Sequence, residues 1–371
     1  MDLLSAFRDA NPRFFEEEFL DYYCGARVGT QLLTGLRASN RAWHAAIPAP
    51  ARCSVSALLR NAAKSGNMEM CLFILSRIPE GERSSTTMLI GAAEGGHLQL
   101  CEFASKHGLG RSVGIMVTYG ALNGHAHICQ RGYEWAVEDG VKFYSYDMIG
   151  NGANGGHLHI CQQAIKLDPK ASIPLMVYGA AAGGHRELFE IALGMLGDDT
   201  LGFAWDQCAY DAARAGNASL CEFILEKSGK SLSLEFLKGG TSGGHIEICK
   251  RACEWFGLDD AEYPDLYKAF TSCMTTAICS GRVDILTFLH DWAREHDDYV
   301  FDWKEILYLR NICKNMTAFR VACEWMVEDR EYVCNWGQLI EWVARVGDEA
   351  AIRVLLEFKD SRGPQPYRAP W

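Results

Sequence analysis

Several signatures of common protein chemistry are missing from this sequence of 371 residues. It contains no Cys-x-x-Cys pair, no His-Glu-x-x-His run and no Walker loop, so the usual spacings of zinc and nucleoside-triphosphate sites are absent. No run of about 18 apolar residues occurs, and no basic-then-apolar segment opens the chain, so we expect neither a membrane span nor a secretory signal. The sequence therefore predicts a protein that is not an enzyme and that carries neither a cofactor nor a metal.

The chain also has fewer basic than acidic residues. Lys and Arg number 36 against 47 Asp and Glu, which gives a net charge of −11. Residues 256–360 hold 20 acids and 11 bases, so this stretch accounts for −9 of the total. An acidic chain does not suit the phosphate backbone of nucleic acids, so we expect no nucleic-acid partner. The acidic stretch is either a site for a basic partner or simply a solvated surface.

A short pattern does recur along the chain. It consists of small residues, a glycine, usually a histidine, and often a cysteine four positions after the histidine. We call the residue after the glycine the anchor, and the spacing of successive anchors averages about 31 residues. The anchors are Asn67, His97, His125, His157, His185, Asn217 and His245, and three degenerate copies follow at Arg282, Asn315 (which follows a lysine) and Asp348. Apolar residues at helical spacing follow each anchor, which predicts one helix on each side of the glycine turn.

The repeated histidine and cysteine invite a metal interpretation, because residues four apart share one face of a helix. A zinc site, however, needs three or four ligands that converge on one point, whereas these pairs are spread along the chain. A structural turn, with the imidazole bonded to backbone groups, is the favoured interpretation. The predicted turn residues are Gly96, His97, Gly124, His125, Gly156, His157, Gly184, His185, Gly244 and His245.

The fifteen cysteines fit the same structural interpretation. Equivalent positions in neighbouring repeats lie too far apart for a disulfide, so we expect buried thiols in a reducing compartment, the cytoplasm. Six of the cysteines share one slot of the repeat, namely Cys71, Cys101, Cys129, Cys161, Cys221 and Cys249.

Residues 96–108, Gly-His-Leu-Gln-Leu-Cys-Glu-Phe-Ala-Ser-Lys-His-Gly, resemble the second helix of an ankyrin repeat, as do residues 244–257. The resemblance covers roughly residues 55–360 and implies an all-α, alpha-helical solenoid of about ten ankyrin-like helix-turn-helix repeats with short or reduced β-hairpin fingers. The Thr-Pro-Leu-His opening of the family is absent from every copy. The Cys-Glu-Trp segments at 253–255 and 323–325 are similar to divergent ankyrin proteins of amoeba-infecting giant DNA viruses, which would place the protein in host cytoplasm.

The ends of the chain do not follow the repeat. Residues 1–50 are predicted to be a helical cap, residues 51–360 the ankyrin-like solenoid, and residues 361–371 an irregular Pro-rich tail. Residues 11–47 also resemble an F-box, although its opening leucine is missing. In that case Leu36 and Trp43 would contact a Skp1-like adaptor of a ubiquitin ligase. Otherwise the segment only covers the first repeat.

Aromatic residues are the remaining candidates for a binding site, because Trp and Tyr are enriched at interface hot spots. Trp205, Trp303 and Trp336 each lie twelve residues before an anchor, and this regular placement favours packing between repeats. The off-register Tyr144, Tyr263 and Tyr299 are candidate protein-binding residues.

The sequence as a whole favours a non-catalytic protein–protein interaction scaffold that binds a protein partner through the concave face and finger tips of an ankyrin-repeat rod. Two alternatives stay open at this point. The chain is an F-box-type substrate receptor of a ubiquitin ligase, or it is a structural component of a virus particle.

Overall fold

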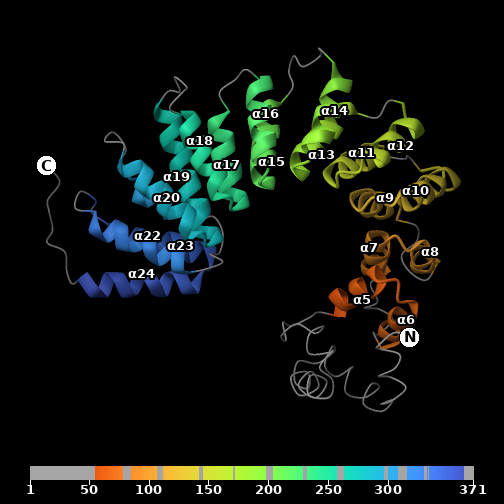
Figure 1. Cartoon of the computed structure of the whole chain (residues 1–371). Helices are drawn as coiled ribbons and strands as arrows, with labels where there is room; N and C mark the ends of the chain where they lie inside the picture. Colours follow the sequence, from red (N-terminus) through yellow and green to blue (C-terminus); the bar gives the residue numbers. More distant parts are fainter. Residues whose placement is uncertain are drawn as a thin grey trace, which may run out of the picture. The chain divides into compact units, whose positions relative to one another are not determined.

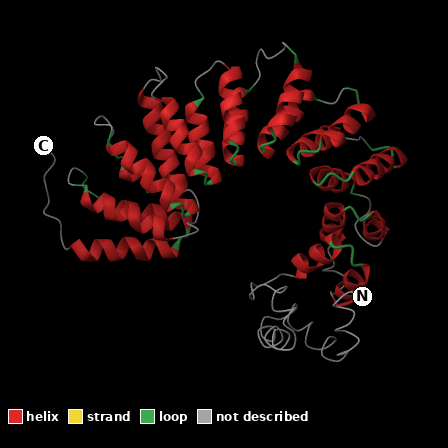
Figure 2. Ribbon diagram, in the orientation of Figure 1, coloured by secondary structure: helices red, strands yellow, loops and turns green. Residues whose placement is uncertain are grey.

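The computed structural model describes a chain of helices joined by short turns. Described are residues 55–77, 85–106, 112–141, 145–169, 172–197, 204–228, 232–256, 263–295, 300–307, 316–329, 332 and 334–362. Within these ranges every regular element is a helix and no strand occurs (Figure 2). The all-α class predicted from the sequence is therefore confirmed. The predicted β-hairpin fingers fall on segments between helix pairs that lie outside the described residues.

The chain divides into two compact units, Met1–Ser172 and Ile173–Trp371. The helices of the first unit are α5 (Val55–Lys64), α6 (Met68–Arg77), α7 (Ser85–Gly95), α8 (Leu98–Lys106), α9 (Val113–Leu122), α10 (Ala126–Glu138), α11 (Ser145–Asn154) and α12 (Leu158–Leu167) (Figure 1). They form four consecutive pairs, α5 with α6 through α11 with α12, and the partners of each pair pack against one another.

The second unit begins with the same arrangement. Its helices are α13 (Ile173–Gly183), α14 (Arg186–Leu196), α15 (Trp205–Ala215), α16 (Ala218–Ser228), α17 (Ser233–Gly243), α18 (Ile246–Phe256), α19 (Tyr263–Ser280), α20 (Val283–Arg294), α21 (Trp303–Ile306), α22 (Met316–Glu328), α23 (Trp336–Val346) and α24 (Glu349–Arg362). Helix α24 continues to Arg362, two residues into the segment 361–371 that was predicted to be an irregular tail.

In each unit the first helices of successive pairs form one continuous layer. Helices α5, α7, α9 and α11 pack in order in the first unit, and α13, α15, α17 and α19 in the second. Close approach explains the small residues in these helices, because a Cβ atom on Gly91 of α7 would lie 2.2 Å from the carbonyl oxygen of Arg60 on α5. Ala92 and Ala93, next to it, are fully buried.

The glycine turn ends one helix and starts the next within two residues. At Gly124 the backbone is left-handed, with φ of +78°, a conformation that only glycine adopts cheaply. The Gly124 N–H donates to the Ala121 carbonyl at 3.2 Å, and the His125 N–H donates to the Gly120 carbonyl at 2.8 Å. These two bonds make a Schellman motif, which satisfies carbonyls that would otherwise be unpaired at the end of α9. His125 is then the N-cap of α10.

The cysteines of the repeat lie beneath the first helices. Cys71, Cys129 and Cys161 are fully buried, and the Cys161 thiol donates to the Ile149 carbonyl at 3.5 Å. The described cysteines are all free thiols. Burial raises the pKa of the Cys71 thiol to about 11 and those of Cys129 and Cys161 to about 12. These thiols therefore act as small core residues and stay protonated at neutral pH.

Of the described helices, none is long and apolar enough to cross a membrane.

Candidate binding surface

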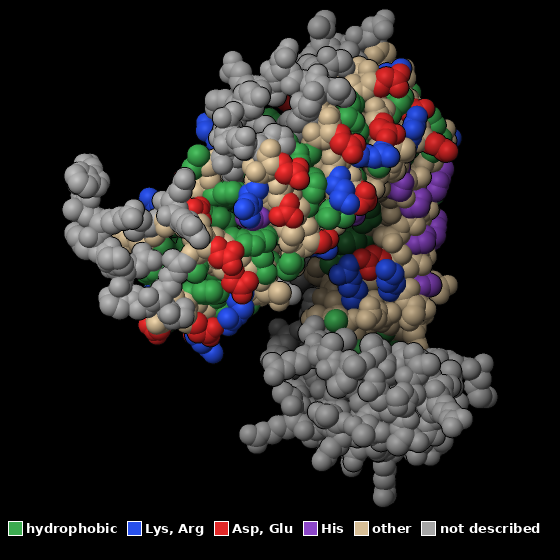
Figure 3. Space-filling view, turned by 60° about the vertical axis from the view of Figure 1, so that its left-hand side comes forward, with side chains coloured by type: hydrophobic (Ala, Val, Ile, Leu, Met, Phe, Trp, Pro, Cys, Tyr) green, Lys and Arg blue, Asp and Glu red, His purple; other side chains and the backbone are tan. Residues whose placement is uncertain are grey.

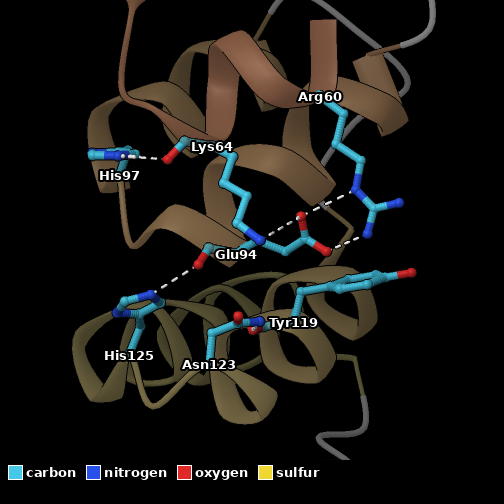
Figure 4. A network of polar contacts seen from close by, with 7 residues as sticks. All are labelled: Arg60, Lys64, Glu94, His97, Tyr119, Asn123 and His125. Atoms are coloured by element: carbon cyan, nitrogen blue, oxygen red, sulfur yellow. Dashed lines mark hydrogen bonds and ion pairs between the residues drawn. The ribbon is translucent and has the colours of Figure 1, made fainter. Parts of the chain in front are cut away.

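Anchor histidines join neighbouring helix pairs within each unit. The sequence indicated a bond to backbone groups at the turn, and the structure shows that the acceptor belongs to the preceding turn. His97 Nε2 lies 3.1 Å from the Lys64 carbonyl oxygen, and His125 Nε2 lies 3.0 Å from that of Glu94 (Figure 4). His245 Nε2 lies 3.2 Å from the Arg214 carbonyl oxygen. In all three cases the acceptor is the residue three positions before the preceding anchor, an end-of-helix carbonyl that lacks a partner within its own helix.

The same imidazole occupies the space above the preceding turn glycine. A Cβ atom on Gly66 would lie 2.6 Å from the His97 ring, and one on Gly96 would lie 2.7 Å from the His125 ring. A side chain at the glycine would therefore collide with the next anchor. We call this arrangement, an imidazole on the preceding glycine and bonded to the preceding helix end, the Gly–His interlock.

An asparagine at the anchor also makes hydrogen bonds to backbone groups at the turns. Asn217 Nδ2 donates to the Gly184 carbonyl, and its Oδ1 accepts from the Leu220 N–H at 3.0 Å, which caps its own helix. The histidine anchors 125, 157 and 185 make no such side-chain cap. Asn67 Oδ1 accepts from the Met70 N–H at 2.9 Å in the same way.

The histidines beside the anchors extend this row in the first unit. His127 Nε2 lies 2.8 Å from the Gly96 carbonyl oxygen, and His159 Nε2 lies 3.1 Å from that of Gly124. The rings of His125 and His127 meet edge to face at 6.0 Å. Figure 3 shows histidine side chains gathered along one edge of the visible face. Among the described residues, no group of three or more His, Cys, Asp or Glu side chains could hold a metal ion.

Two motifs that resemble catalytic or cofactor signatures lie within helices. The run Gly150–Gly155 has the Gly-x-Gly-x-x-Gly spacing of a dinucleotide site, but it occupies the end of α11 and not a strand-to-helix turn. The run Gly240–Gly244 has the Gly-x-Ser-x-Gly spacing of a nucleophile elbow. It lies in the last turn of α17, where Ser242 Oγ accepts a hydrogen bond from the Tyr210 hydroxyl at 3.2 Å.

The protein-binding residues predicted from the sequence fall where the structure gives no side-chain description. Leu36 and Trp43, with the whole of residues 1–50, lie outside the described residues, as do Tyr144 and Tyr299. Tyr263 begins α19, but its side chain is outside the description. The role of these five residues in binding therefore stays a prediction from the sequence.

The side of the first helices opposite the core forms a surface of varied composition. It is made of the residues ten, seven, six and three positions before each anchor except Asn315, where most of these positions lie outside the described residues. These residues are at least partly exposed apart from two glycines, and we call the surface the first-helix face. Examples are Ala57, Arg60, Asn61 and Lys64 on α5, Ile115, Thr118, Tyr119 and Leu122 on α9, and Glu235, Lys238, Gly239 and Ser242 on α17. The turns repeat from pair to pair, whereas this face changes from basic to apolar to mixed charge.

A pocket of about 530 Å³ opens on the first-helix face between α5 and α7. Arg60 and Lys64 come from α5, and Glu94 comes from α7. Arg60 Nε donates to Glu94 Oε2 at 3.0 Å, and Arg60 Nη2 also donates to Glu94 Oε1. Lys64 Nζ lies 3.9 Å from Glu94 Oε2. Hydrogen bonding to Glu94 raises the pKa of the Arg60 guanidinium, which is charged at any physiological pH.

Comparison with known proteins adds no assignment: no protein-family model matches the chain, and no curated protein is significantly similar to it.

Proposed function

We propose that the chain is a non-catalytic scaffold of the ankyrin type, which binds a protein partner through its first-helix face. The observation that supports this function is the contrast between that face and the turns. Glycine, histidine and cysteine recur where they hold helix pairs together, while the residues at the first-helix face differ in charge, size and polarity from pair to pair. A repeated framework with a varied surface is how repeat proteins bind partners.

The arrangement of the helices also supports a solenoid. From α5 to α20, each second helix contacts its own first helix, and within each unit the first helices contact the next first helix. Contacts of this kind extend a fold in one direction, repeat by repeat. Twelve described cysteines are free, ten of them buried, and this is in keeping with a proposed location in a reducing compartment. The F-box-type receptor and the virus-particle component remain predictions from the sequence.

A charge-insertion experiment tests the proposed surface. Thr118→Arg combined with Gln207→Arg places two cations on the first-helix face, and both residues are at least partly exposed. Gln99→Arg combined with Gln162→Arg adds the same charge at exposed positions of second helices α8 and α12. Proteins captured from cell extract are then compared by mass spectrometry for the unchanged chain and both variants.

We expect the first-helix variant to lose partners that the second-helix variant retains. Equal capture by both variants would show that the first-helix face is not the binding surface. The chain without residues 1–50 provides a further comparison. Loss of an adaptor together with other ligase subunits from this truncated chain alone would favour the F-box-type receptor instead.

A further inference from the structure

The pocket between α5 and α7 carries a local charge opposite to that of the whole chain. Two cations, Arg60 and Lys64, share the single carboxylate of Glu94, which leaves the lining with one excess positive charge. The chain as a whole carries −11. Most of that negative charge lies in residues 256–360, whereas the pocket lining itself is positive and attracts an anionic group locally.

The cationic side chains of the pocket are exposed to solvent, whereas the Glu94 carboxylate that pairs with them is nearly buried. The side chains of Arg60 and Lys64 are 44% and 53% exposed, whereas that of Glu94 is 9% exposed. Glu94 binds Arg60 through two of the guanidinium nitrogens, Nε and Nη2, so Nη1 is left for a ligand. Lys64, at 3.9 Å from the carboxylate, has two further N–H donors to offer. Asn61 and Thr87 add neutral polar groups to the lining.

The Gly–His interlock holds the backbone of two of the charged residues in place. Lys64 and Glu94 are the two residues whose carbonyl oxygens accept from His97 and His125, respectively (Figure 4). The Arg60 guanidinium also lies 5.8 Å from the centre of the Tyr119 ring on α9, in cation–π contact. The pocket is therefore held by three successive first helices, and little ordering is needed when a ligand binds.

Apolar residues continue the surface directly beside the charges. Ile90 lines the pocket itself, and the next first helix presents Ile115, Tyr119 and Leu122 at the corresponding face positions. A ligand that crosses from α5 to α9 would thus meet cations first and apolar side chains next. Two cations are too few for a nucleic-acid backbone, whose binding rests on many phosphate contacts.

We infer that this pocket binds the carboxylate of an Asp or Glu side chain in an acidic peptide segment of the partner protein, with apolar residues of the same segment on α9. The inference rests on the proposed binding function and names the chemistry of one part of the first-helix face. Lys64 and Arg60 Nη1 donate to the carboxylate, and Glu94 holds Arg60 in position.

A charge series in the full chain tests the inference. A random-peptide library is selected against the unchanged protein, and the affinities of the selected peptides are measured for variants. Glu94→Gln raises the pocket charge by one, Lys64→Gln lowers it by one, and Lys64→Glu lowers it by two. The matched control is Lys250→Gln on α18, an exposed lysine whose Nζ pairs with Glu247 at 2.8 Å.

We expect the selected peptides to be rich in Asp and Glu. Their affinity should rise for Glu94→Gln, because the amide oxygen still accepts from Arg60 while the competing negative charge is lost. It should fall about tenfold for Lys64→Gln and further for Lys64→Glu, because a charge-assisted hydrogen bond is lost and then replaced by repulsion. Lys250→Gln should leave the affinity unchanged. A misfolded variant would weaken binding, so tighter binding by Glu94→Gln is the outcome that damage to the fold does not produce.

Selection of no peptides, or of peptides without acidic residues, would overturn the inference, and so would affinities that do not follow the pocket charge. Tighter peptide binding to the chain without residues 1–50 would also overturn it, since the occupant would then be a segment of the chain itself. These failures stay distinct from failure of the scaffold function. Peptides that bind independently of Lys64 but are lost with Thr118→Arg would leave the first-helix face as the binding surface.

Discussion

The helix pairs up to Arg282 and those after it are held together by different means. Within each unit up to Arg282, the next anchor lies on the preceding turn glycine, as His97 does on Gly66 and His245 on Gly216. Arg282 itself follows this rule, since a Cβ on Gly244 would lie 2.4 Å from its guanidinium carbon. Gly347, the turn glycine of the last anchor, also has a positive φ of +79°, and no further anchor follows it, so nothing lies within 4 Å of a Cβ placed there. The last turn keeps the backbone form of the repeat without the interlock.

In the helix pairs after Arg282, stacked aromatic rings connect neighbouring helices. His290 of α20 lies with its ring centre 3.9 Å from that of Trp325 of α22 and 5.1 Å from that of Phe301. Phe301 in turn stacks on Trp303 at 5.0 Å, and Trp303 Nε1 donates to Asp329 Oδ2 at 2.7 Å. The comparison teaches that helix pairs can be held together in two ways. A short contact at each turn serves where the repeat is regular, and stacked aromatic side chains, which bury a large area, serve where the repeat spacing becomes irregular.

The largest effect should follow removal of a ring from the aromatic cluster. Trp303 is 1% exposed, so Trp303→Ala should lower the free energy of unfolding by about 3–5 kcal/mol, through a cavity and the loss of the bond to Asp329. Trp336 has the same place in its repeat but is partly exposed, so Trp336→Ala should cost clearly less. Urea denaturation measures both. Equal losses would contradict the role assigned to the cluster.

A pair of glycine substitutions separates backbone strain from the interlock. Gly347→Ala should cost about 1–2 kcal/mol, because alanine is strained at positive φ and meets nothing else. Gly216→Ala has the same strain, with φ of +85°, and in addition brings a Cβ to 2.6 Å from the His245 ring, so about 1–3 kcal/mol more is expected. Adding His245→Ala to Gly216→Ala should remove most of that excess. A double-mutant cycle that shows no coupling between the two residues would contradict the interlock.

A smaller effect is expected from the anchor hydrogen bond alone. His97→Ala leaves the Lys64 carbonyl without its imidazole partner and should cost about 1–2 kcal/mol. His97→Asn should cost less, because asparagine is the native anchor at position 217, where it bonds to the preceding turn. The ordering of the two variants in thermal denaturation checks this prediction, which would be wrong if asparagine were no better than alanine.

The smallest effect concerns pH. Burial lowers the pKa of His290 below its ordinary value of 6.5, while Asp291, Glu328 and Arg294 exert weaker, partly opposing influences. The unfolded chain then binds a proton at a pH where the folded chain does not, so stability is complete above about pH 6.5 and declines as pH falls toward the lowered folded pKa. Denaturation midpoints measured across this range should show the decline, and His290→Phe should reduce it. An unchanged pH profile in that variant would contradict the assignment.

The repeat pattern was sufficient to predict helices on both sides of each glycine. Gly124 and His125 illustrate the reason, since a left-handed glycine and the start of an apolar helical stripe are local properties. The acceptor of the imidazole was not predictable in the same way. It lies 31 residues earlier for His125, and only the packing of neighbouring helix pairs brings it within reach.

The pocket on the first-helix face was likewise missed at the level of sequence. Arg60 and Glu94 are 34 residues apart, and neither belongs to a motif. One signal could have found them. Counting back from successive anchors places Lys64 and Glu94 at the same position of adjacent repeats, where a cation and an acid would face each other. The aromatic pattern instead predicted Tyr144, Tyr263 and Tyr299 as protein-binding residues.

The sequence by itself determined the all-helical class, the period of the helix pairs and the position of each turn, because these depend on glycine, on helical periodicity and on residues close together in the chain. The tertiary structure decided which atoms the anchors contact, how His290 becomes buried among aromatic rings, and where two cations share one carboxylate. Those features join residues of different helices, and their distances are set only when the helices pack.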